Sequence, residues 1–351
     1  MEKALGQGIF PGAVLLASGG DEIRYFKAFG VTDIVSKKTM QKNAVFDLAS
    51  LTKPLSTAMA VFKLFEAGKV FLEQDLSSIM PAICPQDKSN ITIEQLLNHT
   101  SGLPAHREYF HNLMSCKKGL RRDLLRELIL KEPLIGKPGE KQVYSDLGFI
   151  ILAWIVETLS GERINKFVTK NVYEPLGIDN LFFIDNPELF ALGDKYEMVV
   201  PTENCAWRKK LLRAETHDDN AWPVGGIEGH AGLFGDASSV WQILFEIMNG
   251  LNIEETRALN STLLLQFLEK GRRSEFRGGF DTPSKYGSSS GKYFSGASIG
   301  HLGYTGTSFW IDPEKSVIVV LLTNRVHPSR DNNQINRFRP EIHNLIMEKL
   351  L

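Results

Sequence analysis

The sequence has no excess of charge of either sign and no apolar run long enough to cross a membrane. Its 351 residues include 40 Lys and Arg against 41 Asp and Glu, so the formal net charge is -1. That balance gives no electrostatic reason to expect a nucleic acid or an anionic membrane surface as a partner. The longest apolar stretch, residues 147–156, is far shorter than the roughly 18 residues that a membrane span requires. We therefore expect neither a membrane span nor a nucleic-acid partner.

Cysteine is scarce. Cys84, Cys116 and Cys205 are odd in number and widely spaced, which excludes a disulfide framework and fits a reducing compartment. The apolar segment 8–18 is interrupted by a Pro-Gly pair and does not follow a basic region, so it predicts a first core strand rather than a signal peptide. These features predict a cytoplasmic protein, or a periplasmic one if a signal had been removed.

Histidine and glycine do not occur in patterns typical of metal or nucleotide sites. The histidines at 99, 106, 111 and 217 lack HExxH-type spacing, and capping or loop roles are expected for them. The glycines at 229–235 have no preceding strand of the dinucleotide-binding type. His230 among them is interpreted as structural, and the alternative is a role in the acyl pocket. We expect no metal and no cofactor.

Both ends of the chain predict strands, in patterns typical of hairpins. The predicted elements there are a helix over 2–6, strands over 13–17, 23–29, 309–312 and 316–322, and a helix over 342–350. Between the ends the pattern is mostly helical, with helices predicted over 51–67, 92–98, 119–130, 147–160, 239–248 and 261–269. The arrangement predicts an α/β fold in which both termini complete an antiparallel sheet and a large helical region is inserted.

No linker divides the chain into separate domains. We therefore expect one domain over 1–351, with its α/β part at about 1–50 and 290–351 and its mainly helical part at about 51–289. The segment 271–290 is rich in Gly, Ser and Arg and predicts a loop.

Candidate nucleophiles come from a Ser-x-x-Lys pattern, which occurs at Ser50/Lys53, Ser115/Lys118 and Ser289/Lys292. Only Ser50 follows an apolar run and opens a helix with apolar residues at helical spacing. Lys53, one turn later, projects from nearly the same face. The start of a buried helix also offers N–H groups to an oxygen that gains negative charge. The alternative is that Ser50 is an N-cap and Lys53 a solvated first-turn residue.

A second serine pattern, Gly-x-Ser-x-Gly at 287–291, matches the nucleophile elbow of α/β-hydrolases. That elbow requires a hydrophobic strand before it and a helix after it. Neither flanks this segment, so it is interpreted as a loop.

Two further groups of residues suggest chemistry near Ser50. Tyr144-Ser145-Asp146 places a phenol, a hydroxyl and a carboxylate at the entrance of the apolar helix. Near the C-terminus, the segment 300–307 surrounds His301 with glycines and threonines just before a strand, which allows close backbone approach to a ligand. The alternative for His301 is a hydrogen-bonded turn histidine.

Together, Ser-x-x-Lys on a buried helix, Tyr-Ser-Asp and His-x-Gly near the final strands resemble the serine β-lactamase and penicillin-binding-protein superfamily. The similarity is to its class C-like branch of β-lactamases, esterases and D-amino-acid peptidases. Supporting stretches lie at 10–14, 96–103, 229–234 and 322–325, so the resemblance covers about 8–324. It implies that family's β-lactamase/transpeptidase-like fold, an antiparallel sheet flanked by terminal helices with an all-helical subdomain.

The resemblance also implies roles for individual residues. Ser50 would attack a carbonyl carbon to form an acyl-enzyme that water hydrolyses, while Lys53 and Tyr144 share the proton transfer. The backbone N–H groups of Ser50 and Tyr304 would form the oxyanion hole. His301 takes the place of the lysine in the Lys-Thr-Gly form of the third motif, with Gly303 beside it in the substrate-binding segment.

The second motif departs from the family's usual form because it ends in Asp146 rather than Asn. A carboxylate beside Lys53 would keep the ammonium charged and raise its pKa, which makes Lys53 a poor base. We therefore hypothesise that Tyr144 is the base and that Lys53, with Asp146, orients its phenolate. The family pattern alone leaves both bases open.

The third motif departs from the family's Lys-Thr-Gly form because His301 replaces the lysine. Histidine is mostly neutral near pH 7, whereas a lysine would offer a permanent cation to a substrate carboxylate. This favours ester or amide substrates of weaker anionic character. Arg325, Arg272 or Arg273 could still supply charge from elsewhere.

These observations predict a serine acyl hydrolase that acts through a covalent acyl-enzyme on an ester, amide or β-lactam bond. The expected partner is a small-molecule or peptide substrate. The alternative is a non-catalytic, penicillin-binding-like protein that binds peptidoglycan-type or acyl ligands. The sequence does not rank the substrates or indicate an oligomeric state.

Overall fold

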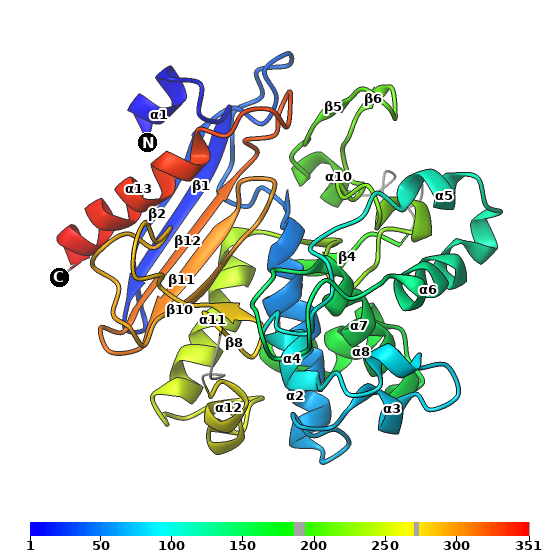
Figure 1. The fold of residues 1–351 in the computed structure, drawn as a ribbon. Coiled ribbons are helices and arrows are strands. Elements are labelled where there is room, and N and C mark those ends of the chain that lie inside the picture. The colour runs from blue at the N-terminus through cyan, green and yellow to red at the C-terminus, as the bar shows by residue number, and fades with distance from the viewer. Residues whose placement is uncertain (186–193, 270–273, 351) are drawn as a thin grey trace.

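The computed structural model describes residues 1–185, 194–269 and 274–350, and its largest element is a seven-stranded sheet (Figure 1). The strands are β1 (Gly12–Gly19), β2 (Glu22–Gly30), β8 (Phe276–Arg277), β9 (Phe280–Asp281), β10 (Ile299–Leu302), β11 (Ser308–Asp312) and β12 (Val317–Thr323). Their order is β2-β1-β12-β11-β10-β9-β8, and every neighbouring pair is antiparallel. The predicted antiparallel sheet completed by both termini is confirmed.

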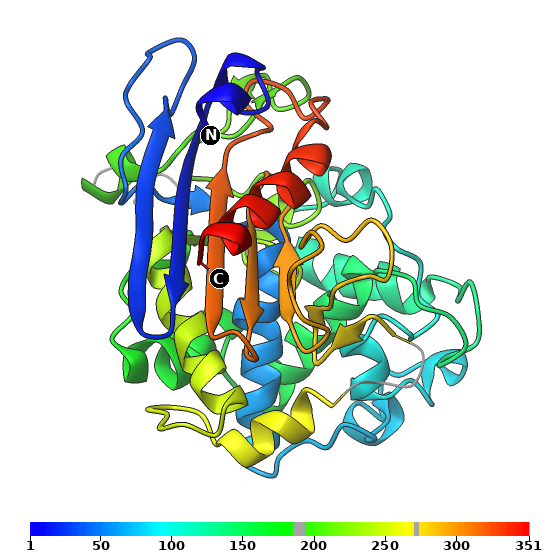
Figure 2. The same cartoon turned by 90° about the vertical axis from the view of Figure 1, so that its left-hand side faces the viewer.

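Both faces of the central strands β1, β12 and β11 are buried, whereas the edge strand β2 is largely exposed. Along β1, Ala13 and Leu15 pack into one hydrophobic cluster, whereas Val14 and Leu16 pack into the other, as the period of two requires. The first cluster lies under the terminal helices α1 (Glu2–Gly6) and α13 (Ile335–Leu350), and Figure 2 shows α13 lying across the strands. The second cluster is covered by α11 and the helical region. Burial on both sides explains why the central strands are continuously apolar.

The inserted region is mainly helical and holds two small sheets. Its helices are η1 (Ala49–Leu51), η2 (Lys53–Ala58), α2 (Met59–Glu66), α3 (Leu76–Ile79), η3 (Gln86–Lys88), α4 (Ile93–Leu97), α5 (Phe110–Met114), η4 (Lys118–Leu120), α6 (Arg121–Lys131), α7 (Asp146–Ser160), α8 (Ile164–Val168), η5 (Thr169–Tyr173), η6 (Glu174–Leu176), α10 (Asp194–Met198), η7 (Trp222–Val224), α11 (Ala237–Leu251) and α12 (Ser261–Phe267). The small sheets are β3 (Phe46–Asp47), β7 (Leu233–Gly235) and β4 (Leu181–Phe183), and β5 (Asn204–Cys205) with β6 (Lys210–Leu211). Within the described ranges, no helix has the length and apolar character needed to cross a membrane.

Several element boundaries differ from the sequence-based prediction. The last helix begins at Ile335 rather than 342 and contains Pro340 in its interior. Part of the predicted loop at 271–290 forms β8 and β9, joined by two glycines with positive φ, which only glycine adopts without strain. Residues 270–273 of that loop lie outside the described residues.

The helix that carries Ser50 consists of three successive forms rather than one continuous α-helix. A 3₁₀ turn, η1, leads through Thr52 into the π-helical η2 and then into α2. Pro54 lies in the first turn of η2, where a missing N–H does no harm. Every residue of η2 is buried, so this helix fixes the position of Ser50 from the core.

Candidate active site

Residues from all three sequence motifs meet at one cavity of about 390 Å³. Its lining includes Ser50, Tyr144, His301, Gly303 and Tyr304. Ser50 is partly accessible rather than closed away. The larger hollows beside α12 and beside α13 contain none of these five residues. The convergence makes this cavity the candidate active site.

The turn before Ser50 is held by a buried carboxylate. Ala49 has a φ of 48°, a left-handed conformation that costs a non-glycine residue energy. The Asp47 carboxylate accepts hydrogen bonds from the backbone N–H of Ala49 at 2.8 Å and of His217 at 2.7 Å. Burial raises the pKa of Asp47 above its ordinary value, although both hydrogen bonds oppose this shift. Asp47 thus stabilises the strained turn that presents the nucleophile.

We expect Asp47→Ala to lower the free energy of unfolding by about 2 kcal/mol, because two buried N–H groups lose their acceptor. It should also lower kcat more than it raises KM, because the Ser50 turn loses its support. Urea unfolding and steady-state kinetics measure both effects. The matched control is Asp236→Ala, which removes the N-cap of α11 and should cost about 1 kcal/mol while leaving kcat unchanged. A kcat loss equal in both variants would contradict a positioning role.

Two threonines tie the same turn to the third motif. The Thr305 hydroxyl donates to the Asp47 carbonyl at 2.7 Å, and the Thr307 hydroxyl donates to the Leu48 carbonyl at 3.0 Å. A Cβ at Gly303 would lie 1.9 Å from the Thr307 Oγ1, so no larger residue fits there. These contacts fix Ser50 and the segment after β10 against each other.

Lys53 is fully buried beside Ser50. Its ammonium donates to the Ser50 Oγ at 3.0 Å, to the Asp146 Oδ1 at 2.7 Å and to the His230 carbonyl at 3.3 Å. These three acceptors use all three protons of the ammonium. The alternative interpretation of the sequence is therefore wrong, because Lys53 is not solvated and Ser50 caps neither η1 nor η2.

The predicted effect of Asp146 on the pKa of Lys53 is confirmed. Burial alone would lower the pKa of Lys53, but the charge of Asp146 and the proximity of Tyr144 outweigh it and raise the pKa. Burial would raise the pKa of Asp146, but the Lys53 ammonium and a hydrogen bond from His106 hold it far below its ordinary value. The free protein therefore contains a Lys53–Asp146 ion pair, with Lys53 protonated.

Tyr144 lies over the ion pair, with the Lys53 ammonium 4.8 Å from its ring centroid. The rings of His99 and Phe276 pack against the Tyr144 ring, with distances between ring centroids of 4.5 Å and 5.8 Å. Desolvation raises the pKa of Tyr144, and the Lys53 charge opposes that rise. The phenol is therefore protonated in the free protein, and Lys53 is placed to stabilise the phenolate once it forms.

The middle residue of the Tyr-Ser-Asp motif is structural. The Ser145 hydroxyl donates to the Pro104 carbonyl at 2.7 Å and accepts from the Gly148 N–H at 3.4 Å as the N-cap of α7. The Ser145 N–H donates to the His99 Nδ1 at 2.9 Å. His99, for which a capping or loop role was expected, thus helps to orient the motif from the segment just after α4.

His301 is buried and neutral. Its Nδ1 pairs with the Leu302 carbonyl at 3.0 Å, so the proton lies on Nδ1 and Nε2 is an acceptor. Burial and the nearby Lys53 charge lower the pKa of His301 to about 3. The Nε2 atom is buried and bonds to no partner in the described part of the chain. His301 can therefore accept a hydrogen bond from a substrate but cannot attract a substrate carboxylate.

Two backbone N–H groups beside the cavity donate to no protein acceptor among the described residues, and they are the two to which the family resemblance assigns the oxyanion. The Ser50 N–H lies in the first turn of η1, where no helix carbonyl precedes it. Within the described ranges, the Tyr304 N–H donates to no protein acceptor. Both residues line the cavity, so their N–H groups are available to a carbonyl oxygen of a substrate.

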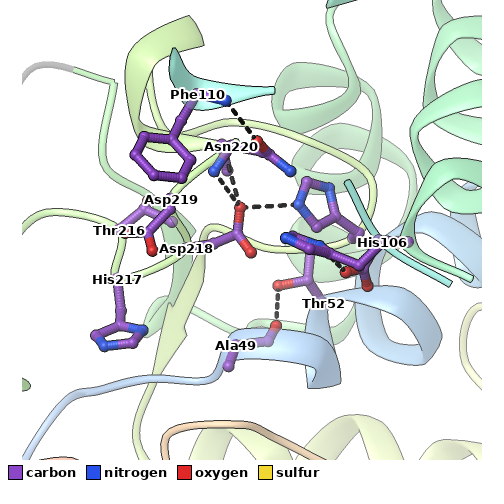
Figure 3. Close-up of polar contacts among 12 residues, drawn as sticks. Ala49, Thr52, His106, Phe110, Thr216, His217, Asp218, Asp219 and Asn220 are labelled. Atoms are coloured by element: carbon purple, nitrogen blue, oxygen red, sulfur yellow. Dashed lines mark hydrogen bonds and ion pairs between the residues drawn. The ribbon is translucent and has the colours of Figure 1, made fainter. Parts of the chain in front are cut away.

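A second layer of polar residues supports Lys53 and was missed by the sequence interpretation. The Asp146 Oδ2 pairs with the His106 Nδ1 at 3.1 Å, which raises the pKa of His106. His230, whose carbonyl accepts from Lys53, pairs through Nε2 with the Asp218 Oδ1 at 2.9 Å. Figure 3 shows Asp218 close to Asn220, whose backbone N–H donates to the same Asp218 oxygen at 3.0 Å. The one sequence signal for this layer was the family-like stretch at 229–234.

Charged residues outside the three motifs also line the cavity. Burial raises the pKa of Asp281 to about 7, and Asp281 and Arg325 both line the cavity. Arg272 and Arg273, considered above as alternative cations, lie outside the described residues. Over the described part of the chain, no group of three or more His, Cys, Asp or Glu residues is arranged to hold a metal ion.

Comparison with known proteins identifies a matching family and solved structures of the same fold. The family model described as "Beta-lactamase" matches residues 1–344. A relative from Salmonella paratyphi A, named "Putative D-alanyl-D-alanine carboxypeptidase", is 28% identical over 93% of this chain and 82% of its own length. Among solved structures, EstCE1, "a hydrolase with promiscuous acyltransferase activity", superposes with a TM-score of 0.72 and 22% identity over 97% of this chain and 96% of its own. The octameric penicillin-binding protein homologue from Pyrococcus abyssi superposes with a TM-score of 0.74 and 20% identity, over 100% of this chain and 77% of its own.

Proposed function

Because the chain belongs to the β-lactamase family, we propose that it is a serine acyl hydrolase that acts on an ester, amide or β-lactam bond through a covalent enzyme intermediate. The observation that carries the proposal is the contact of 3.0 Å between the Lys53 Nζ and the Ser50 Oγ. Lys53 is held there by Asp146, and Ser50 opens onto the cavity. A serine that contacts a charged lysine, in a cavity whose lining residues Ser50 and Tyr304 have N–H groups without an acceptor in the described part of the chain, is suited to acyl transfer.

The reaction starts when the Ser50 Oγ forms a bond to the carbonyl carbon and its proton passes to the phenolate of Tyr144, the proposed base. The developing oxyanion accepts hydrogen bonds from the Ser50 and Tyr304 N–H groups. Collapse of that intermediate breaks the bond to the leaving group, which takes up the proton held by Tyr144. Water then attacks the acyl carbon and gives one proton to Tyr144. The bond to the Ser50 Oγ breaks, Ser50 takes up that proton, and the acyl product leaves as a carboxylic acid. Removing one oxyanion donor typically costs about 3 kcal/mol of transition-state stabilisation.

Tyr144 is the proposed base, since Lys53 uses all three of its protons in hydrogen bonds and its pKa is raised. Because the pKa of Tyr144 is also raised, the phenolate is a minor form at neutral pH, and its fraction grows as the pH rises toward that pKa. We expect kcat/KM to increase between pH 7 and 9, and Tyr144→Phe to lower it by about 10²- to 10⁴-fold. A series of kcat/KM values against pH for the parent, Tyr144→Phe and Lys53→Met tests this assignment.

The matched control for Tyr144→Phe is Tyr109→Phe. Tyr109 bonds to Glu132 through its hydroxyl and does not line the cavity, so its loss should leave the pH profile unchanged. Activity of Tyr144→Phe comparable to the parent would contradict the assignment of Tyr144 as the base.

Intact-protein mass spectrometry tests the proposed function as a whole. The protein is incubated with a fluorophosphonate and, separately, with a penicillin. We expect a fluorophosphonate adduct on Ser50 and a penicillin adduct that decays with time. A persistent penicillin adduct would support a penicillin-binding role instead, and the absence of any adduct would support a silent binder.

A substrate panel then separates the acyl classes. The relative named as a carboxypeptidase favours a D-Ala-D-Ala peptide, and the likeness to EstCE1 favours an ester such as p-nitrophenyl butyrate. Nitrocefin represents the β-lactams. The class with the highest kcat/KM identifies the scissile bond that this cavity accepts.

A further inference from the structure

The ring of Tyr304 lies in the wall of the catalytic cavity and is half exposed. Two side chains pack on it. The His217 ring stacks on it, with 5.7 Å between ring centroids and 27° between ring planes, and the Arg325 guanidinium carbon lies 4.6 Å from its centroid. The backbone N–H of Tyr304 is one of the two groups assigned to the oxyanion. A contact that fixes the ring therefore also restrains the residue that supplies this N–H.

His217 is itself held firmly. It is buried, and its ring Nε2 pairs with the Glu203 Oε2 at 3.0 Å. Glu203 pairs in turn with the Arg330 Nη2 at 2.6 Å. Hydrogen bonds to charged groups are shorter and stronger than those between neutral groups. The His217 ring is thus fixed in the orientation that it presents to Tyr304.

The backbone of His217 contacts the support of the other oxyanion group. Its N–H donates to the Asp47 Oδ2 at 2.7 Å, while the Asp47 Oδ1 accepts from the Ala49 N–H at 2.8 Å. Ala49 immediately precedes Ser50, whose N–H is the second group assigned to the oxyanion. One buried residue therefore contacts the supports of both N–H groups, although it lies far from each of them in the sequence.

An oxyanion site requires that both N–H groups reach the same oxygen, at about 2.7–3.1 Å each. Here they come from separate segments, the turn before η2 and the turn after β10, so neither helix nor strand geometry sets their spacing. Thr305 and Thr307 connect the two turns directly, and His217 adds a connection through the side chain of Tyr304. His217 does not line the cavity, so its effect on the reaction passes through other residues.

We propose that His217 is a positioning residue for the oxyanion site, which sets the spacing of the Ser50 and Tyr304 N–H groups through Asp47 and through the Tyr304 ring. This inference rests on the proposed function, because it assumes that Ser50 is acylated in this cavity. It implies that the transition state depends on the ring of His217 rather than on the hydrogen bond of that ring to Glu203.

Two substitutions separate the ring from its hydrogen bond. His217→Phe keeps a planar ring against Tyr304 but does not bond to Glu203, which retains its pair with Arg330. His217→Gln keeps a side-chain donor for Glu203 but has no ring. Both variants keep the backbone N–H that donates to Asp47.

The substrate for these variants is the preferred ester, defined as the one with the highest kcat/KM among p-nitrophenyl acetate, butyrate and hexanoate. We expect His217→Gln to lower kcat/KM about tenfold, because a small displacement of an oxyanion donor weakens the transition state. His217→Phe should stay within about threefold of the parent.

Phenylboronic acid gives a readout that a loss of folded protein does not change. It bonds reversibly to a serine oxygen as a tetrahedral adduct, so it resembles the transition state rather than the substrate. We expect its dissociation constant to rise about tenfold in His217→Gln and to stay within about threefold of the parent in His217→Phe. The final extent of fluorophosphonate labelling counts the active sites in each preparation.

The matched control is His327→Gln. His327 is another buried histidine that pairs with a carboxylate, that of Asp33 at 3.3 Å, and it does not line the cavity. Its replacement should change neither kcat/KM per labelled site nor the affinity for phenylboronic acid. Equal losses in His217→Gln and His327→Gln would show a structural role only and would overturn the proposal.

A further variant, Tyr304→Leu, keeps the oxyanion N–H but removes the ring that His217 contacts. In this background His217→Gln should cause no further loss, because the ring that transmits its effect is absent. Equal losses in His217→Phe and His217→Gln, or an undiminished effect of His217→Gln in the Tyr304→Leu background, would overturn the proposal. If His217→Gln does not fold, Tyr304→Leu alone decides, since unchanged kcat/KM in that variant would overturn it.

The outcomes also distinguish failure of this inference from failure of the proposed function. If the parent hydrolyses the ester and is labelled on Ser50, while His217→Gln keeps the activity of the parent, only the positioning role is wrong. Absence of both hydrolysis and labelling in the parent would overturn the proposed function and the positioning role together.

Discussion

Replacement of Ser50 by alanine is expected to lower kcat/KM at least about 10⁴-fold and to abolish the fluorophosphonate adduct. The reason is that the Ser50 Oγ is the atom that contacts Lys53 at 3.0 Å and opens onto the cavity. Without it, catalysis is limited to what the oxyanion donors and substrate binding provide to a water molecule. The fold should persist, because the side chain caps no helix. Steady-state kinetics and thermal unfolding of the same preparation measure both quantities.

The chain contains two natural controls, since the Ser-x-x-Lys pattern recurs at Ser115 and Ser289. The Ser115 hydroxyl donates to the His111 carbonyl at the end of α5, and the Ser289 carbonyl accepts from His343. Neither residue lines the cavity. Ser115→Ala and Ser289→Ala should therefore retain activity within about twofold and keep the adduct. Substantial residual turnover in Ser50→Ala, or loss of labelling in either control, would contradict Ser50 as the nucleophile.

The local part of the site could be predicted from the sequence because it depends on helical geometry. Ser50 and Lys53 are one turn apart, and helical spacing alone places their side chains on one face. In the structure, the Lys53 Nζ lies 3.0 Å from the Ser50 Oγ. The direction of the Lys53 pKa shift followed from the charge of Asp146 once the second motif was assumed to lie beside the first. These predictions needed no knowledge of how the sheet closes.

The contacts of the site between residues far apart in the sequence could not be derived from the periodicity of apolar residues. Tyr144 and Tyr304 reach the cavity because α7 packs against the Ser50 helix and because β10 and β11 join the central sheet. The resemblance to a family supplied that proximity, not any local pattern. Asp47 and His230 were missed because each acts through a backbone group in a contact between distant segments, and Asp218 was missed because it acts by pairing with His230. Such contacts have no repeat in the sequence that could reveal them.

Local sequence patterns also failed to predict the pairing of β8 with β9 and the early start of α13. Gly278 and Gly279 suggest a flexible loop when read locally, yet their positive φ angles close a tight hairpin at the sheet edge. Pro340 suggests the boundary of a helix, yet α13 continues through it because its apolar residues pack on the sheet. In both places tertiary packing outweighed local propensity.

Replacement of Lys53 by methionine is expected to lower kcat/KM by about 10³-fold or more and to reduce the free energy of unfolding by about 3 kcal/mol. Methionine keeps the length of the side chain but removes the cation that contacts Ser50 and neutralises Asp146. The Asp146 carboxylate, with 18% of its side chain exposed, would then be a largely buried charge that keeps only its contact with His106. Urea unfolding at pH 7 and kinetics on the preferred ester give the two values.

The double variant Lys53→Met/Asp146→Asn decides whether the stability loss comes from the unpaired charge. Removing the carboxylate as well should restore a large part of the lost free energy of unfolding but none of the activity, because the cation beside Ser50 remains absent.

The dependence of stability on pH in the acid range is an independent test of the ion pair. The pKa of Asp146 is lowered in the folded protein, so its contribution is present above its ordinary pKa of about 4 and is lost as the pH falls further. The difference in stability between the parent and Asp146→Asn should therefore narrow below about pH 4. The ion pair between Lys53 and Asp146 would not stabilise the site by charge if the double variant were no more stable than Lys53→Met. The same conclusion would follow if the stability difference between the parent and Asp146→Asn did not change with pH.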